Sequence, residues 1–135
     1  VIFDPLRYDD DSNSLANTNN DITGSHTLNN VSFTDVITCG DQDTNITSGT
    51  TLTVAGDLVI DQNEFCGNPA LHIYGPGSIS VQGDLTTSNR GSGGDITITM
   101  SGTNTQSITQ NGTNFPTGTF TINKSFILTY LSYSS

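Results

Sequence analysis

Short alternating segments of apolar and polar residues recur along the chain, separated by Gly- and Asn-rich stretches. Their side chains are mostly β-branched or aliphatic, which favours strands, whereas Gly and Asn favour turns. No window shows a sustained apolar period of about 3.6 residues, the signature of an amphipathic helix. The pattern predicts an all-β protein with strands around LTV, LVI, LHI, ISV, ITI and FTI, at residues 52–54, 58–60, 71–73, 79–81, 96–98 and 120–122.

A sequence repeat underlies this alternation. The stretch from Cys39 to Leu58 and the stretch from Cys66 to Leu85 both begin with Cys-Gly and end with Gly-Asp-Leu, at a constant offset (66 − 39 = 27, 85 − 58 = 27). Stepping by this period aligns apolar residues in several columns, and it aligns glycines at one corner. The columns are Val31/Leu58/Leu85, Phe33/Ile60, Ile46/Ile73/Met100, Thr44/Leu71/Ile98, Val54/Val81/Ile108 and Gly40/Gly67/Gly94.

A period of this length with short strands is typical of one turn of a parallel β-solenoid, in which stacked turns share a continuous core. About five turns account for a chain of 135 residues. We expect one domain, with an N-terminal segment (1–24), repeat turns (25–125) and an apolar C-terminal strand (126–135). A β-sandwich is the rival architecture, but it does not require a constant spacing. The residues predicted to point into the core are Ile46, Val54, Leu58, Ile73, Val81, Leu85, Ile98, Met100 and Ile108.

The charge balance restricts the partners. Three basic residues face thirteen acidic ones, for a net charge of −10. Phosphate backbones and anionic membrane surfaces both require basic contacts, so we expect neither nucleic-acid binding nor membrane insertion. No leader segment is recognisable, which is expected of a mature chain or an excised piece. The low Lys content and abundant Thr and Asn suit a secreted or cell-surface protein.

The phrase SGTNTQSITQNGTNFPTGTFTINKS, at residues 101–125, resembles the G-T-x-x-Q-x-I … L-T-I-N-K phrase of large secreted bacterial surface proteins of the haemagglutinin-like adhesin type. The turns that contain Gly-Asp-Leu resemble the T-L-x-V-x-G-D-L repeats of the same proteins. The resemblance covers about residues 44–125, and it implies a right-handed solenoid and an extracellular setting. This chain is shorter than those proteins, and its cysteine pair departs from their pattern.

Cys39 and Cys66 lie one period apart, so a solenoid would place them in register on neighbouring turns. Parallel strands lie about 4.8 Å apart, within the Cα separation that a disulfide accepts. We predict a disulfide between them if the compartment is oxidising. The alternatives are a buried thiol pair or a metal site, although His26 and His72 do not share the cysteines' column.

A second polar column, Asn30, Asp57, Asp84 and Asn111, is the strongest candidate for chemistry. Stacked carboxylates repel one another unless a cation, a proton or backbone amides compensate. The favoured interpretation is a turn ladder, in which Asp and Asn side chains accept hydrogen bonds from backbone amides at a corner. A calcium site and a catalytic acid pair are the alternatives, and no other cofactor is expected.

Two functions follow from different classes of protein. The first is an extracellular structural protein, a filament subunit or adhesin stalk, that is not an enzyme and whose partners are copies of itself. The second is a carbohydrate-binding or polysaccharide-cleaving β-helix, for which surface glycans would be the partners. The tail favours the first, because an apolar strand beside an open edge can pair with the next subunit. The predicted junction residues are Phe126, Ile127, Leu128, Tyr130, Leu131 and Tyr133.

Overall fold

The computed structural model describes residues 2–3, 18–35, 42–62, 71–89, 93–111 and 114–124. Within these ranges the chain forms thirteen β-strands and no helix. The all-β prediction is therefore confirmed. The strands belong to three sheets, here called sheets A, B and C, and every strand pairing within them is parallel.

Sheets A and C have five strands each and sheet B has three. Sheet A contains, in spatial order, β1 (Ile2–Phe3), β4 (Val31–Asp35), β7 (Leu58–Gln62), β10 (Leu85–Asn89) and β12 (Ile108–Gln110). Sheet B contains β2 (Thr18–Ile22), β5 (Gln42–Ile46) and β8 (Leu71–Tyr74). Sheet C contains β3 (His26–Leu28), β6 (Thr51–Val54), β9 (Ser78–Val81), β11 (Thr97–Met100) and β13 (Phe120–Ile122).

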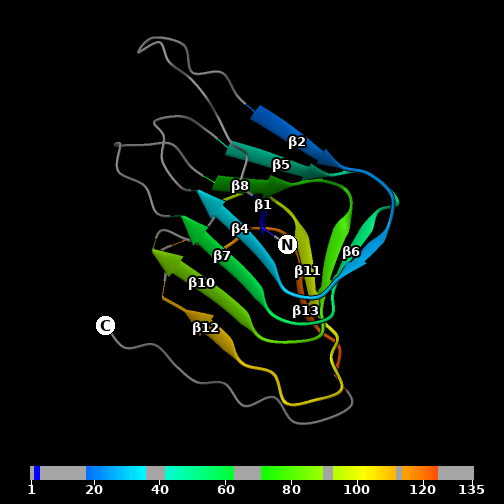
Figure 1. Cartoon of the computed structure of the whole chain (residues 1–135), viewed down its shortest axis with the longest axis vertical. Coiled ribbons are helices and arrows are strands. Elements are labelled where there is room, and N and C mark those ends of the chain that lie inside the picture. Colours follow the sequence, from blue (N-terminus) through cyan, green and yellow to red (C-terminus); the bar gives the residue numbers. More distant parts are fainter. Residues whose placement is uncertain are drawn as a thin grey trace.

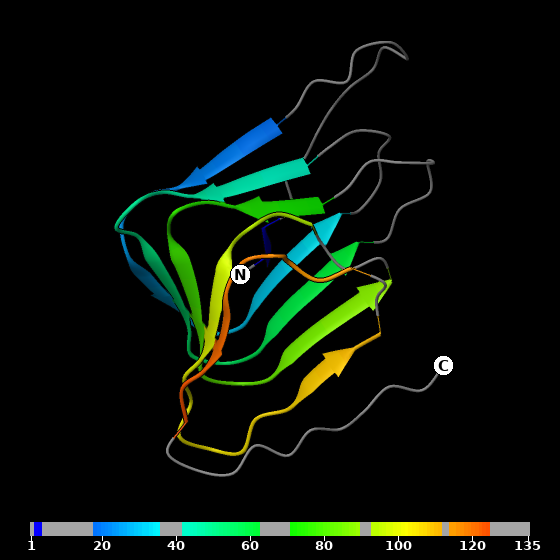
Figure 2. The ribbon, with the colours of Figure 1, turned by 180° about the vertical axis from the view of Figure 1, so that it is seen from behind.

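The chain winds repeatedly through the three sheets. From β2 to β10 it visits sheets B, C and A in turn, so each strand from β2 to β7 pairs with the strand three elements later. Figures 1 and 2 show the result as strands of successive turns lying side by side around a common interior. None of the three sheets closes on itself. This arrangement is compatible with a parallel β-solenoid, whereas hairpins of a sandwich would give antiparallel pairs.

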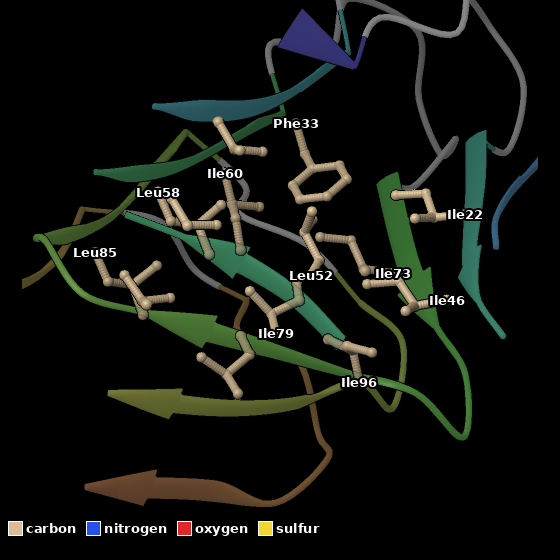
Figure 3. Close-up of a cluster of buried hydrophobic side chains, with 14 of the residues drawn as sticks. Ile22, Phe33, Ile46, Leu52, Leu58, Ile60, Ile73, Ile79, Leu85 and Ile96 are labelled. Carbon is tan, nitrogen blue, oxygen red and sulfur yellow. The ribbon is translucent and has the colours of Figure 1, made fainter. Parts of the chain in front are cut away.

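The core lies between the sheets and is built from alternate residues of each strand. In β6, β7, β9 and β11 the burial alternates with a period of two, as expected when one face of a strand is covered. The aliphatic side chains converge with the Phe33 ring in the interior (Figure 3). Eight of the nine residues predicted to point inward are buried, and Ile108 packs half-buried against them on β12.

The predicted register holds in the middle of sheets A and C. Leu58 pairs with both Val31 and Leu85, Phe33 pairs with Ile60, and Val54 pairs with Val81. The columns that contain these residues are confirmed to that extent. Inward positions on neighbouring turns therefore carry similar aliphatic side chains, and that similarity is what keeps the interior evenly filled.

The register departs from the period elsewhere, and several predicted columns are wrong. Met100 pairs with Val81, and Ile98 pairs with Ile79, so neither aligns with a residue of β8. Ile73 lies beside Thr44 and not beside Ile46. Ile108 pairs with Leu85, at a shorter offset (108 − 85 = 23), and not with Val81.

The shortened turn has a local cause. Between β10 and β11, the described residues of the third side of the stack pair through one bridge, which joins His72 to Gly93. Gly94 then crosses closely over β8 with a positive φ of 96°, where an added Cβ would collide with the Ile73 carbonyl oxygen. A residue with a side chain would not fit there. Because one short crossing replaces a strand, β9 and β11 pair at a much smaller offset (97 − 78 = 19).

Candidate functional site

Side-chain oxygens form a hydrogen-bonded ladder at the corner where the chain passes from sheet C to sheet A. Asn30 Oδ1 accepts a hydrogen bond from the Asp57 backbone N–H at 2.9 Å. Asp57 Oδ1 accepts one from the Asp84 N–H at 2.8 Å. Asp84 Oδ1 accepts one from the Ser107 N–H at 2.7 Å. Each side chain thus satisfies an amide of the next turn at a position where no strand supplies a partner.

This ladder explains the recurring Gly-Asp-Leu sequence. An added Cβ on Gly83 would collide with the Gly56 carbonyl oxygen and with Asp57 Oδ1. The glycine therefore leaves room for the carboxylate of the preceding turn. The aspartate supplies the next acceptor, and the leucine that follows it, Leu58 or Leu85, is buried in the core. The three positions have three separate physical roles.

The fourth predicted member of the column, Asn111, does not belong to the ladder. Its place is taken by Ser107, because Leu85 pairs with Ile108. Asn111 follows the end of β12, where its backbone N–H donates to the Thr87 carbonyl oxygen at 2.8 Å. The constant spacing was the only reason to include it, and the shortened turn removes that reason.

The chemistry open to the ladder follows from these contacts. Asp57 and Asp84 each have one carboxylate oxygen that accepts a hydrogen bond from a backbone amide. Within the described residues, no group of three or more His, Cys, Asp or Glu side chains is placed to hold a metal. The geometry is that of a structural corner, and each of its hydrogen bonds contributes about 0.5–1.5 kcal/mol.

A second polar cluster, which the sequence analysis did not single out, lies on the outer face of sheet B. His72 Nδ1 and Asp43 Oδ1 are 3.1 Å apart, and both side chains are about one fifth exposed, at 22%. The His72 and Tyr74 rings lie 5.2 Å apart at 30°. On the adjoining positions Asn45 donates to Asp21 Oδ1 at 3.2 Å. The contact between His72 and Asp43 has a different offset (72 − 43 = 29), so the sequence period could not reveal it.

His26 lies apart from this cluster. Its ring Nε2 is 3.0 Å from the Thr23 carbonyl oxygen, and the residue is exposed at the start of β3. His26 and His72 belong to different sheets. The structure does not bring the two histidines to one site.

Gln106 is the most consequential residue that sequence reasoning missed. Its side chain is fully buried, at 0% exposure. Nε2 donates to the carbonyl oxygens of Val81 and Gly83, and Oε1 accepts from the Gly102 N–H. Gln106 thereby fills the interior of the shortened turn and provides partners for the Gly102 N–H and the Gly83 carbonyl oxygen. Gln106 is visible in the sequence SGTNTQ at residues 101–106, but a single Gln is usually exposed, so the sequence did not predict its burial.

The other predicted site residues lie outside the described residues. These are the predicted disulfide pair, Cys39 and Cys66, and the predicted subunit junction, Phe126, Ile127, Leu128, Tyr130, Leu131 and Tyr133. Both predictions stay predictions.

Comparison with known proteins identifies no relative: no family model, no curated protein and no solved structure matches the chain. Among the described residues there is also no helix with the length and apolar character of a membrane span. The class of protein is thus defined by the fold alone, as an all-β chain with three sheets of parallel strands.

Proposed function

We propose that the chain is a right-handed parallel β-solenoid of about five turns and that it serves as an extracellular structural protein. In this proposal it is a self-assembling filament subunit or an adhesin stalk, built by head-to-tail stacking, and it is not an enzyme. The observation that carries the proposal is that the three sheets consist of parallel strands and do not close on themselves, because the edge strands of such sheets can pair with the strands of another copy.

The C-terminal end of the stack supports this proposal. In the part of the chain that is described, β12 and β13 are the last strands of sheets A and C, and each pairs on one side. On β13, Ile122 is 47% exposed, and the Phe120 ring meets the Phe115 ring edge to face at 5.5 Å. An apolar edge of this kind favours strand addition, with burial worth about 25 cal/mol per Å².

The opposite end would supply the complementary edge. There β1, β3 and β2 are the outermost described strands of sheets A, C and B. Joining unlike ends gives a heterologous contact that propagates when it does not close on itself. The resemblance to secreted adhesins and the acidic, lysine-poor composition support an extracellular location for such a filament, with other copies of the chain as its partners.

Deletion of residues 126–135 tests the assembly. The full chain should form fibres that are visible by electron microscopy and sediment rapidly, whereas the deletion variant should remain a folded monomer. Thr86→Asp, an outward-facing change on a central strand of sheet A, is the control and should assemble like the parent. Fibres that form unchanged without residues 126–135 would refute this junction, and a monomeric parent would refute the filament.

A carbohydrate-binding or carbohydrate-cleaving function is the alternative, and the outer face of sheet B is the observation in its favour. The His72 and Tyr74 rings with Asp43 nearby combine an aromatic surface with hydrogen-bonding groups, a combination that sugars require. Cleavage would instead need carboxylates free to act on a substrate, and Asp57 and Asp84 are engaged in the ladder. Incubation with neutral and acidic polysaccharides, with Tyr74→Ala and Asp84→Ala as variants, separates binding from turnover.

A further inference from the structure

The outer face of sheet C carries an ordered array of hydroxyl side chains. Each of its five strands contributes a Ser or Thr to one file that runs across the sheet. Each member of this file lies directly opposite the next member on the neighbouring strand. We call this the inner file, and its members are Thr27, Thr53, Ser80, Thr99 and Thr121.

A second file lies two positions earlier on the three central strands. It consists of Thr51, Ser78 and Thr97, which are also paired in register. Together the two files form the hydroxyl face, and none of its members is buried. The side chains also contact one another: the hydroxyl oxygens of Thr51 and Ser78 lie 3.3 Å apart. This contact restricts the Thr51 and Ser78 side chains, which reduces the entropy that they lose when a ligand is bound.

The hydroxyl face is uncharged, although the whole chain has a net charge of −10. The described acidic residues are not members of this face: Asp57 and Asp84 lie at the corner ladder, Asp21 and Asp43 on sheet B, and Asp35 and Asp61 on sheet A. Asp95 precedes β11, and its carboxylate accepts a hydrogen bond from the Gly75 N–H at 3.2 Å. An uncharged, periodic face is complementary to an uncharged, periodic surface. Ions and nucleic acids are therefore poor ligands for it, and two crystalline solids, ice and a packed polysaccharide, remain.

The spacing of the files can be compared with that of ice. Neighbouring strands lie about 4.8 Å apart, and residues i and i+2 of one strand lie about 6.6 Å apart. In tetrahedral ice, hydrogen bonds of about 2.75 Å place second-neighbour oxygens about 4.5 Å apart and repeat the layers every ~7.3 Å. The mismatch along the inner file is about 0.3 Å per strand, so it accumulates to about 1.2 Å over the sheet. That is about a quarter of a lattice repeat along the inner file, and the spacing between the two files differs from the layer repeat by about 0.7 Å.

The chemistry of threonine also favours ice. Its hydroxyl both donates and accepts hydrogen bonds, as each lattice water does. Its methyl group restricts the orientation of the adjacent water, so part of the ordering needed for ice is already present. Polysaccharide surfaces are instead bound mainly through aromatic side chains. The members of the hydroxyl face include no aromatic residue.

We propose that the hydroxyl face of sheet C binds the surface of ice and restrains its growth. The proposal rests on the register and chemistry of this one face, so it stands whether or not the chain assembles into filaments.

The test measures ice shaping, and the gap between melting and freezing temperatures, for the full chain. The parent should facet ice crystals and show a gap. The double variant Thr53→Tyr/Thr99→Tyr should lose both effects, because two large rings would hold the ice away from the inner file. The matched control is Thr86→Tyr, an outward-facing threonine on the central strand β10 of sheet A, and it should retain them. Tyrosine suits exposed strand positions, so both variants should keep the parent's circular dichroism.

Three outcomes would overturn the proposal. The first is a parent that neither shapes ice nor shows a temperature gap, a result that requires no variant. The second is a double variant as active as the parent. The third is an inactive parent that cosediments with crystalline cellulose or chitin while the double variant does not, which would assign the hydroxyl face to a polysaccharide.

Discussion

Replacing Gln106 with alanine should destabilise the protein strongly, because this side chain satisfies backbone groups inside the shortened turn. The Gly102 N–H and the Gly83 carbonyl oxygen would lose a partner. The Val81 carbonyl oxygen would keep one, since it also accepts from the Ser101 N–H at 2.7 Å. The Gly102 N–H is buried and the Gly83 carbonyl oxygen is half-buried. At about 1–3 kcal/mol for a buried orphaned group and less for a half-buried one, the expected loss is about 2–4 kcal/mol, and the cavity left behind adds to it. A typical domain has only about 5–15 kcal/mol in total.

Urea unfolding followed by circular dichroism measures this loss. With a slope of about 1–3 kcal/mol per molar urea, the midpoint should fall by roughly 1 M or more. Gln82→Ala is the matched control, because Gln82 is exposed on a neighbouring turn and its change should stay within about 0.5 kcal/mol. Equal midpoints for the two variants would refute the role assigned to Gln106.

Gln106→Glu separates hydrogen bonding from volume. The carboxylate keeps an acceptor for the Gly102 N–H but turns its second oxygen toward two carbonyl oxygens, where the amide had donated. Burial and these carbonyls disfavour the charged form, so the introduced group should bind a proton more tightly when folded than when unfolded. The variant's deficit relative to the parent should therefore shrink as pH falls and widen as pH rises through the folded-state value. A Gln106→Glu variant as stable as the parent at every pH would mean that packing, and not the donated hydrogen bonds, explains the loss in Gln106→Ala.

Three further predictions concern the ladder, the core and the cysteines. Asp84→Ala should lower the free energy of unfolding by about 1–2 kcal/mol, because the Ser107 N–H loses its acceptor. Asp84→Asn keeps the acceptor and should melt like the parent with or without calcium. Calcium-dependent melting of the parent would instead indicate a cation site. Leu85→Asp should lower the free energy of unfolding by several kcal/mol, because it places an unpaired charge in the core. The control Thr86→Asp, at an outward-facing position, should not. Similar melting of the two variants would contradict the register. Cys39 and Cys66 should resist alkylation until they are reduced, as intact mass would show, and alkylation of both without reductant would exclude the disulfide.

The parts of the fold that the sequence predicts are those governed by alternation within a strand. A buried strand face needs apolar residues at every second position, so Leu52 and Val54, or Ile79 and Val81, identify both the strand and its inward side. Pairing between turns was predictable only where the corners have equal length. The pairing of Ile108 with Leu85 was not, because the length of a corner loop leaves no periodic trace in the sequence.

The candidate sites divide along the same line. Asn30, Asp57 and Asp84 were recognisable because a corner with constant geometry selects the same side-chain type in each turn. Gln106 and the His72–Asp43 contact each occur once, at places where the period fails, so no column could reveal them. Residues that recur with the period indicate the architecture, whereas residues that occur once indicate local contacts that the period does not predict.

This distinction also bears on where function resides in a stacked chain. The corner ladder and the core repeat because every turn must solve the same two problems, an unpaired amide and an open apolar face. Neither problem requires the outward positions of sheet C to be alike, because those side chains lie in solvent and the fold tolerates many residue types there. Yet the inner file holds only Thr and Ser across all five strands, from Thr27 to Thr121. The sequence offset between its paired members is not constant, since it falls from 53 − 27 = 26 to 99 − 80 = 19. The uniformity therefore follows the position in space and not the period in sequence. A high strand propensity of threonine accounts for part of it, and the outward file of sheet A shows the same preference in Ser32, Thr86 and Thr109, interrupted by Val59. Sheet B carries Asp43, His72 and Tyr74 at its outward positions. Sheet C thus differs from the other two sheets in having an outward file that no other residue type interrupts, and this uninterrupted file is the feature on which the ice-binding proposal depends.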